Sequence, residues 1–540
     1  MGRLIGGTNR RADRLLALLP QLCLALVVVL TVAYTVTGAI VRPNMYSDSG
    51  WGFVGWYTQD RAASFNHSLS PDLADISREV EAFMTTWTPG QHLLPGLVER
   101  LGLSLGLSII VVVAAFSVLG LWGWFALYRA FGFPLQTTAL ALGIIACNRF
   151  FNLSFTNYSG GEVLLFGVAP WFILMAWRLR ELRWFAVLPL LVGAAVLVFA
   201  KLSGIIVGAA VVGGVAICGD RAWLNRDTVR KLAVAGVTIG LMGAIFYFAW
   251  YTRGVTAVSI STPPHPDGLL FYVSFGVGCL WSASLSLLDL GNYLFLNPGR
   301  QVLTSVDAVA YAFFPLAVAT FAVTWVRLRA TYGEYLRFAY SVSAAILVVF
   351  LITWMAGKSV SFDERHLRVP SLLLFIGVVQ AFTTSRSWLL RSSFAAIAGL
   401  ACLYGVTSFV TRTWANEHYP MGDRGFRQMS ASAEAVAFIR TIDLAGPEGK
   451  RTLIFLPSPE IALEVRHARS WSNQADFESL ERLKAQVYRG RVDRLYVFVQ
   501  KRLLDNGKAD AILRSFVDYP IDGWTMVPLG DLVCFYQVRN

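Results

Sequence analysis

Residues 15–41 read LLALLPQLCLALVVVLTVAYTVTGAIV, an uninterrupted apolar run without a single charge. A helix needs about 20 apolar residues to cross the hydrocarbon core of a bilayer, so this run is long enough to span it. It is too long for the apolar core of a signal peptide, and it lacks a small-residue cleavage signature. Four cations precede it and predict a cytoplasmic N-terminus: Arg3, Arg10, Arg11 and Arg14.

The composition of the whole chain points to lipid as its solvent. Of 540 residues, 55% are hydrophobic and 15% are charged, whereas soluble domains carry about 25% charged residues. The net charge of +12 does not indicate nucleic acid as a partner, because most arginines lie in short loops between apolar runs, where they set orientation. The six cysteines show neither a CxxC motif nor Cys/His ligand spacing, so the sequence predicts no disulfide framework and no zinc site.

Ten further apolar runs follow, and together they predict about eleven transmembrane helices. The runs are 102–128, 134–147, 163–178, 184–200, 202–218, 232–251, 307–326, 338–356, 370–384 and 393–411. The loops that counting places in the cytoplasm are also the basic ones, with arginines at 178–183, 221–230, 327–337 and 386–391. The opposite, outer side receives the first outer loop 42–100, the outer loop 252–306 and everything after Arg412.

The chain divides at about residue 412, where the composition changes. Residues 1–412 are predicted to form the transmembrane domain, and residues 413–540 a soluble α/β domain on the outer side. Strand patterns lie at 451–457 and 494–499, and helical spacing at 431–441 and 476–488. The predicted fold class is therefore an α-helical polytopic membrane protein with a C-terminal soluble α/β domain. The sequence has no P-loop, no GxSxG and no HExxH motif.

Two loop segments need a separate interpretation. The apolar piece 269–288 would invert all later spans if it crossed once, so we predict an interfacial or re-entrant segment; Ser282, Ser284, Ser286 and Asp289 favour an interface. In the first outer loop, Ile76, Val80 and Phe83 are spaced on one face of residues 70–83. This spacing predicts an amphipathic helix lying at the membrane surface, as part of a set of juxtamembrane helices.

Two carboxylates stand out on the outer side. Asp48 follows the first span in YSDSGWGF (46–53), where partial desolvation would suit it to act as a base; alternatively it caps a turn. Glu162 ends the segment 148–162, NRFFNLSFTNYSGGE, which also holds Arg149 and Tyr158. Glu162 opens the next helix, where the helix dipole stabilises a carboxylate even without a chemical role.

Two groups of cations share that side. Lys201 is the only charge between two apolar runs and lies outside, against the positive-inside preference; either it snorkels to the interface or it meets an anionic ligand. The segment 358–370, KSVSFDERHLRVP, carries Lys358, Arg365, His366 and Arg368 directly before a span. Its guanidinium groups suit a lipid-linked phosphate, unless Asp363 and Glu364 merely neutralise them.

The order of these clusters resembles the GT-C superfamily of membrane glycosyltransferases, which includes lipid A aminoarabinose transferases and protein O-mannosyltransferases. Asp48 occupies the position of the superfamily's acidic residue in the first outer loop. The stretch 200–204, AKLSG, is similar to its Thr-Lys-Gly-Pro signature, of which only the lysine and a nearby glycine match. Residues 364–370, ERHLRVP, are similar to its Arg-Tyr-hydrophobic-Pro segment, with His366 in place of the tyrosine.

The resemblance implies inverting transfer of one hexosyl or pentosyl unit from a polyprenyl-phosphate donor to a glycolipid or cell-envelope glycan. Asp48 would be the catalytic base, and Lys201, Arg365, His366 and Arg368 would bind the donor phosphate. Glu162, Arg149, Tyr158 and Lys358 are further candidate substrate contacts. No cofactor is expected, and the missing Asp-x-Asp motif argues against a divalent metal. The expected location is a bacterial inner membrane, with the C-terminal domain periplasmic.

A transporter or flippase of lipid-linked saccharides is the competing interpretation, because it would also place ionisable residues within a helix bundle. Transporters usually show inverted repeats and helices interrupted near the middle of the membrane, and neither pattern is evident in this sequence. The polar residues instead gather at the outer ends of the predicted spans. That distribution favours an enzyme that works at one surface of the membrane.

Overall fold

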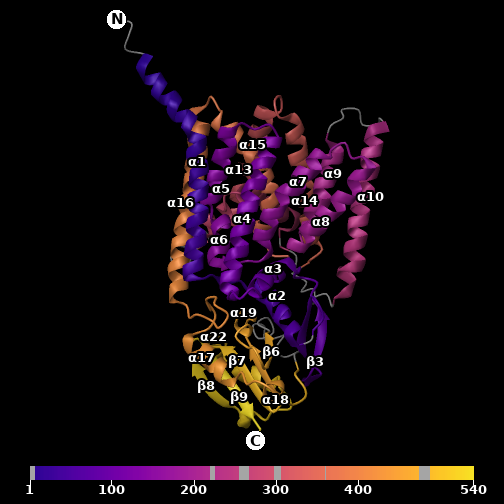
Figure 1. Cartoon of the computed structure of the whole chain (residues 1–540), viewed down its shortest axis with the longest axis vertical. Helices are drawn as coiled ribbons and strands as arrows, with labels where there is room; N and C mark the ends of the chain where they lie inside the picture. Colours follow the sequence, from indigo (N-terminus) through magenta and orange to yellow (C-terminus); the bar gives the residue numbers. More distant parts are fainter. Residues whose placement is uncertain are drawn as a thin grey trace.

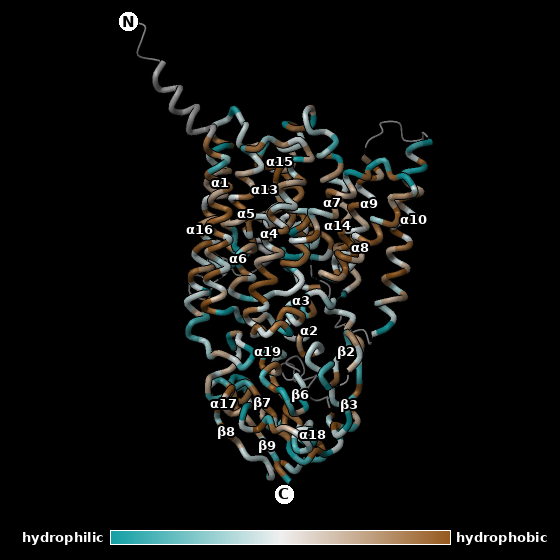
Figure 2. Tube along the Cα trace, viewed as in Figure 1, coloured by the Kyte–Doolittle hydropathy of each residue, from teal (hydrophilic) through white to brown (hydrophobic). Residues whose placement is uncertain are grey.

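The computed structural model describes residues 6–61, 63–218, 226–254, 265, 267–296, 306–358, 360–472 and 487–539. The chain is mostly helical. Long helices stand side by side in a bundle, with the N-terminus at one end and a C-terminal sheet beyond the other (Figure 1). Apolar residues dominate the bundle, and hydrophilic ones gather at its ends and around the sheet (Figure 2).

All eleven predicted apolar runs form helices. They are α1 (Gly6–Val41), α4 (Leu105–Ala130), α5 (Leu135–Cys147), α7 (Gly161–Arg178), α8 (Val187–Ala200), α9 (Gly204–Ile217), α10 (Arg226–Ala249), α13 (Val306–Leu328), α14 (Gly333–Met355), α15 (Arg368–Thr383) and α16 (Trp388–His418). Within the described residues, eight helices are long and apolar enough to cross a membrane. The number rises to ten if each of two bent helix pairs is one span, while α8 and α9 are shorter apolar helices. The count of eleven spans stays a prediction.

The two bent pairs lie near the polar clusters. Helix α5 continues after a 41° bend as α6 (Arg149–Thr156), and α11 (Gly268–Ser282) turns by 104° into the helical segment that begins with α12 (Leu287–Gly291). The second pair covers the predicted interfacial or re-entrant segment, and its geometry fits either a re-entrant loop or a broken span.

The interfacial setting predicted for the serines of this segment is wrong. Ser282 and Ser286 are fully buried, and their hydroxyls donate to Glu364 Oε2 at 2.9 Å and to Asn148 Oδ1 at 2.8 Å. The backbone nitrogen of Ser284 donates to Ser371 Oγ at 2.9 Å. Because irregular backbone is tolerated at membrane depth only where protein surrounds it, these polar groups pair inside the bundle rather than with water.

The helix predicted over residues 70–83 is also wrong, because this segment forms a β-hairpin. Strands β2 (His67–Asp72) and β3 (Asp75–Phe83) pair antiparallel. Ile76 is buried in the core of the C-terminal region, and the Arg469 guanidinium donates to the carbonyls of residues 76, 77 and 78 at 2.8, 3.1 and 2.7 Å. Tertiary pairing therefore overrides the helical spacing. The juxtamembrane helices of the first outer loop are instead α2 (Ser47–Thr58) and α3 (Gly90–Glu99).

The C-terminal region contains a five-stranded mixed sheet in the order β6-β5-β7-β9-β8. Its strands are β5 (Thr452–Leu456), β6 (Arg469–Ser472), β7 (Arg494–Gln500), β8 (Thr525–Leu529) and β9 (Leu532–Val538), and its helices are α17 (Ala433–Ile442), α18 (Pro447–Lys450), α19 (Pro459–Ala462), α22 (Lys501–Asp505) and α23 (Ala509–Arg514). Strand β5 pairs parallel with β6 and β7, and β9 pairs antiparallel with β7 and β8. The two predicted strands are β5 and β7, and the predicted helix 431–441 is α17. Most of the predicted helical segment 476–488 lies outside the described residues.

A short parallel pairing joins two loops that are distant in sequence. Strand β1 (Asn44–Met45), just after α1, pairs with β4 (Asn157–Tyr158), just before α7. The buried Asn416 near the end of α16 secures this junction, since its amide donates to the Thr156 carbonyl at 2.7 Å. Asp48 and Glu162 are thereby carried to the same end of the bundle, where α2 and α3 lie between the bundle and the sheet (Figure 1).

Candidate active site

The four polar clusters predicted from the sequence meet at this end of the bundle. Arg365 contacts both carboxylates that stood out in the sequence, because its guanidinium lies 3.4 Å from Asp48 Oδ2 and 3.6 Å from Glu162 Oε1. Lys201 Nζ donates to the same Glu162 oxygen at 2.6 Å. A continuous chain of charges therefore runs from Asp48 through Arg365 and Glu162 to Lys201, drawn from α2, the start of η5 (Glu364–Leu367), α7 and the end of α8.

Asp48 lies in the first turn of α2, and its side chain is 50% exposed. Close packing on both sides fixes the helix that carries it. A Cβ on Gly50 would lie 2.9 Å from the Glu460 nitrogen in α19, and a Cβ on Gly52 would lie 2.8 Å from His92 Nδ1 in α3. Because only glycine permits such approaches, α2 is held between α3 and the C-terminal region, with its carboxylate facing open space.

His92 packs against Gly52 of α2 and makes the stability of the fold depend on pH. The ring is fully buried, and neither of its nitrogens has a hydrogen-bond partner among the described residues. Burial lowers the pKa of His92 to about 3, from an ordinary value of 6.5. The folded protein thus holds the neutral ring, while the unfolded chain takes up a proton below about pH 6.5.

We expect stability to fall as the pH drops from about 6.5 towards 3, by about 2 kcal/mol at pH 5 from His92 alone. Thermal melts of the detergent-purified protein at pH 7 and pH 5 measure this loss. The His92→Leu variant, which cannot titrate at this position, should lose less stability over the same interval than wild type. An equal loss in both proteins would contradict the assignment to His92.

The charged chain is buried apart from Asp48. The side chains of Glu162, Lys201 and Arg365 are 13%, 17% and 20% exposed. Asp363 adds a third carboxylate, with its Oδ2 3.2 Å from Arg365 Nε. The pairs that Glu162 forms with Lys201 and Arg365 are shielded from most water and hold their geometry, because separating them would leave a buried charge uncompensated.

A large cavity opens on this chain. Its volume is about 860 Å³, and its ionisable lining comes from Asp48, Glu162, Lys201, Arg365 and His366. Aromatic and aliphatic side chains complete the wall, among them Trp87, Ile205, Phe246, Tyr251, Phe350 and Phe362. His366 Nε2 lies 3.1 Å from Ser361 Oγ at the same wall. The cavity thus offers both a charged face and an apolar face.

An apolar groove of about 290 Å³ adjoins this cavity. The two share Ile205 and Phe246, and the groove continues between α8 and α10 along Leu191, Ala194, Ala195, Val198, Phe199, Met242, Ile245, Ala249 and Trp250. Pro89 in front of α3 closes the end nearest the first outer loop. A ligand with a charged head and a long apolar tail therefore has a place for each part.

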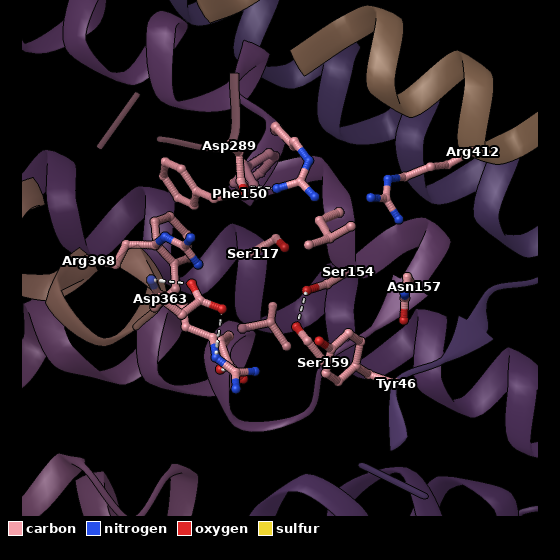
Figure 3. A pocket seen from close by; sticks show the side chains of 17 residues that line it. Tyr46, Ser117, Phe150, Ser154, Asn157, Ser159, Asp289, Asp363, Arg368 and Arg412 are labelled. Carbon is pink, nitrogen blue, oxygen red and sulfur yellow. Dashed lines mark hydrogen bonds and ion pairs between the residues drawn. The ribbon is translucent and has the colours of Figure 1, made fainter. Parts of the chain in front are cut away.

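A second, smaller pocket of about 210 Å³ lies behind Arg365; we call it the arginine pocket. It is lined by four guanidinium groups, three carboxylates and several small polar side chains (Figure 3). The arginines are Arg149, Arg365, Arg368 and Arg412, and the carboxylates are Glu162, Asp289 and Asp363. Arg365, Glu162 and Ser159 line both spaces and form the wall between them.

The structure separates the predicted site residues into groups. Asp48, Glu162, Lys201, Arg365 and His366 line the large cavity, whereas Arg149 and Arg368 line only the arginine pocket. Tyr158 is buried, and its hydroxyl donates to the Gln91 carbonyl at 2.5 Å. Lys358 is exposed and lines neither space.

Three lining residues escaped the sequence reasoning about function. Asp289, assigned to an interface, forms an ion pair with Arg149, and Asp363, treated as a neutralising neighbour, lines the arginine pocket. From the sequence, Arg412 only marked the end of the predicted transmembrane domain. It directly follows the apolar run 393–411 at the end predicted to lie outside, so the exception to the positive-inside preference that singled out Lys201 applies to it as well.

Within the described ranges, no three His, Cys, Asp or Glu side chains converge in a way that could hold a metal ion. Three carboxylates, those of Asp48, Glu162 and Asp363, each contact Arg365. Metal-independent chemistry remains a prediction from the sequence.

Comparison with known proteins shows likeness in structure only. No protein-family model matches the chain, and no curated protein matches it in sequence. Among solved structures, ArnT from Cupriavidus metallidurans bound to undecaprenyl phosphate is similar over 95% of this chain and 98% of its own, with 13% identity and a TM-score of 0.51. The arabinofuranosyltransferase AftD from Mycobacteria is similar over 95% of this chain, with 14% identity and a TM-score of 0.50. The chain spans 40% of AftD.

Proposed function

We propose that this chain, which has the fold of the GT-C membrane glycosyltransferases, transfers one sugar from a polyprenyl-phosphate donor to an acceptor outside the cytoplasm. The acceptor is a glycolipid or a cell-envelope glycan, the transfer is inverting, and neither a metal nor a cofactor takes part. The enzyme resides in a bacterial inner membrane with its C-terminal region outside.

The observation that carries the proposal is the half-exposed Asp48 at the charged wall of a cavity that leads into an apolar groove. A polyprenyl-phosphate sugar has these three parts in the same order: a sugar, a phosphate and an apolar chain. The groove between α8 and α10 suits the chain, and the charged wall suits the phosphate. Undecaprenyl phosphate bound to the structurally similar ArnT supports this choice of lipid.

Lys201 and Arg365 are the proposed phosphate ligands. Both line the cavity, and each keeps N–H groups that Glu162 does not use: Lys201 has three donors and Arg365 five. Glu162 contacts both cations and so sets their spacing before the donor arrives. His366 lies at the same wall, and we assign it a further hydrogen bond to the phosphate.

The proposed reaction needs one proton transfer and one displacement. The Asp48 carboxylate takes the proton of the acceptor hydroxyl as its oxygen attacks the anomeric carbon of the donor sugar. The bond between that carbon and the phosphate oxygen breaks, and the electron pair leaves with polyprenyl phosphate. Lys201 and Arg365 stabilise the negative charge that develops on the phosphate, and attack opposite the leaving group inverts the anomeric centre.

A flippase of lipid-linked saccharides would use the same cavity without breaking a bond, and one experiment separates the two. The purified chain is placed in liposomes with polyprenyl-phosphate pentoses and hexoses and with cell-envelope extract as acceptor. We expect protein-dependent release of polyprenyl phosphate and incorporation of the sugar into the extract. Movement of intact donor between leaflets, with no polyprenyl phosphate formed from any donor, would overturn the proposal.

A further inference from the structure

We propose that the arginine pocket binds an anionic group of the acceptor, so that the enzyme has a second anion site apart from the donor phosphate site. This inference rests on the proposed function, because it assigns the pocket to the acceptor of that reaction. Arg368 and Arg412 are its defining cations, and they lie on opposite sides of the pocket with their guanidinium groups directed into it (Figure 3).

Neither of these arginines has a carboxylate partner in the part of the chain that the structure describes. Arg149 is paired with Asp289, and Arg365 with Glu162 and Asp363, which accounts for every carboxylate lining the pocket. Arg368 stacks over the Phe150 ring at 4.8 Å, and its Nε is buried without a hydrogen-bond partner. Two guanidinium groups thus line one cavity without an ion pair within 4.0 Å among the described residues, and Arg368 is balanced only at longer range by Glu364, Asp363 and Glu162.

An uncompensated charge away from bulk water is costly unless an anion or a hydrogen-bonding partner arrives. Two guanidinium groups across a small cavity form a good receptor for phosphate or carboxylate oxygens, which they bind in bidentate fashion. The volume of about 210 Å³ is many times the 10–15 Å³ that one ordered water requires, so a compact anionic group fits.

The donor phosphate is a poor occupant of this pocket. The apolar groove shares residues with the large cavity and none with the arginine pocket, so the lipid chain leads to the Lys201 side of the wall. Arg365 and Glu162 stand between the two spaces. A second anion on the far side of this wall therefore belongs to the other substrate.

The remaining lining suits a saccharide. Ser154 and Ser159 place their hydroxyls 3.4 Å apart, and the buried Asn157 Oδ1 has no hydrogen-bond partner among the described residues. Such groups bind sugar hydroxyls, whereas the arginines bind an anion. The acceptor class is therefore a saccharide that carries a phosphate or a carboxylate close to the hydroxyl that is glycosylated.

Binding assays on the full-length protein in detergent test this inference. The soluble probes are glucose 1-phosphate, glucuronate and neutral glucose, titrated at constant ionic strength with saturating undecaprenyl phosphate present. We expect at least one anionic probe, and not glucose, to bind to wild type and raise its melting temperature. Whichever anion binds more tightly identifies the acceptor group as phosphate or carboxylate.

Two sets of variants locate the binding. Arg412→Gln should lower the affinity for the anionic probe about 10- to 100-fold, and Arg412→Lys should lower it less. Both variants should bind undecaprenyl phosphate as wild type does. Lys201→Met should show the reverse pattern. Unchanged undecaprenyl phosphate binding also establishes that the Arg412 variants are folded.

Three outcomes would overturn the inference: no anionic probe binds, the probe competes with undecaprenyl phosphate, or Arg412→Gln leaves its affinity unchanged. Failure of the proposed function gives a different result. In that case no donor is consumed and no polyprenyl phosphate is released, whatever the behaviour of the anionic probe.

Discussion

Asp48→Asn protein is expected to transfer sugar about 10²- to 10⁴-fold more slowly than wild type, because the amide cannot accept the proton of the acceptor hydroxyl. Binding of undecaprenyl phosphate should stay within a few-fold of wild type, since Asp48 contacts Arg365 only at 3.4 Å and its side chain is half exposed. The measurement is the turnover number with saturating donor, alongside the dissociation constant for undecaprenyl phosphate.

The matched control is Asp60→Asn, which removes an exposed carboxylate shortly after the same helix. It should keep wild-type turnover. Full turnover by the Asp48→Asn protein would show that Asp48 is not the base. A loss of undecaprenyl phosphate binding as large as the loss of turnover would instead assign Asp48 a structural role beside Arg365.

Arg365→Met is expected to lower turnover by about 10²- to 10³-fold, the range seen when one charge-stabilising group is removed from an active site. This variant should also have a lower affinity for undecaprenyl phosphate, because Arg365 is a proposed phosphate ligand. It leaves Glu162 with Lys201 as its one ion-pair partner within 4.0 Å among the described residues and frees Asp48 from its contact. Turnover and the affinity for undecaprenyl phosphate therefore fall together, unlike the effect of Asp48→Asn.

Arg365→Lys sharpens this test. Lysine keeps the charge but has only one nitrogen. The guanidinium contacts Asp48, Glu162 and Asp363 through three different nitrogens. We expect only partial recovery. Arg329→Met, at an exposed position beyond α13, is the control and should behave as wild type. If the Arg365→Met protein bound undecaprenyl phosphate as tightly as wild type, Arg365 would not be a ligand of the donor phosphate.

Local patterns were reliable wherever solvent alone decides the structure. An apolar segment away from water must satisfy its own backbone, and a helix does this within the segment, so all eleven runs became helices, including those too short to cross a bilayer alone. Residues 70–83 show where this reasoning stops. Their spacing fits a helix, yet a paired strand and the Arg469 guanidinium, nearly four hundred positions away, hold them as a hairpin.

The candidate site was foreseeable in its members and not in its arrangement. Membrane burial makes charges expensive, so Asp48, Glu162, Lys201 and Arg365 stood out individually. Their common side followed from the arginine bias of the loops. Nothing local indicated that one guanidinium would contact three carboxylates, or that Arg365 would line both spaces while Arg368, three positions later, lines only the arginine pocket.

The sequence by itself therefore determined the helices, the side on which the polar clusters lie and the candidate residues, because each depends on the transfer of single segments or charges between water and lipid. Only the tertiary structure decided the hairpin, the buried partners of Ser282 and Ser286, and the wall that divides the large cavity from the arginine pocket. These features depend on pairs of groups distant in sequence, whose free energy exists only once the chain has brought them into contact.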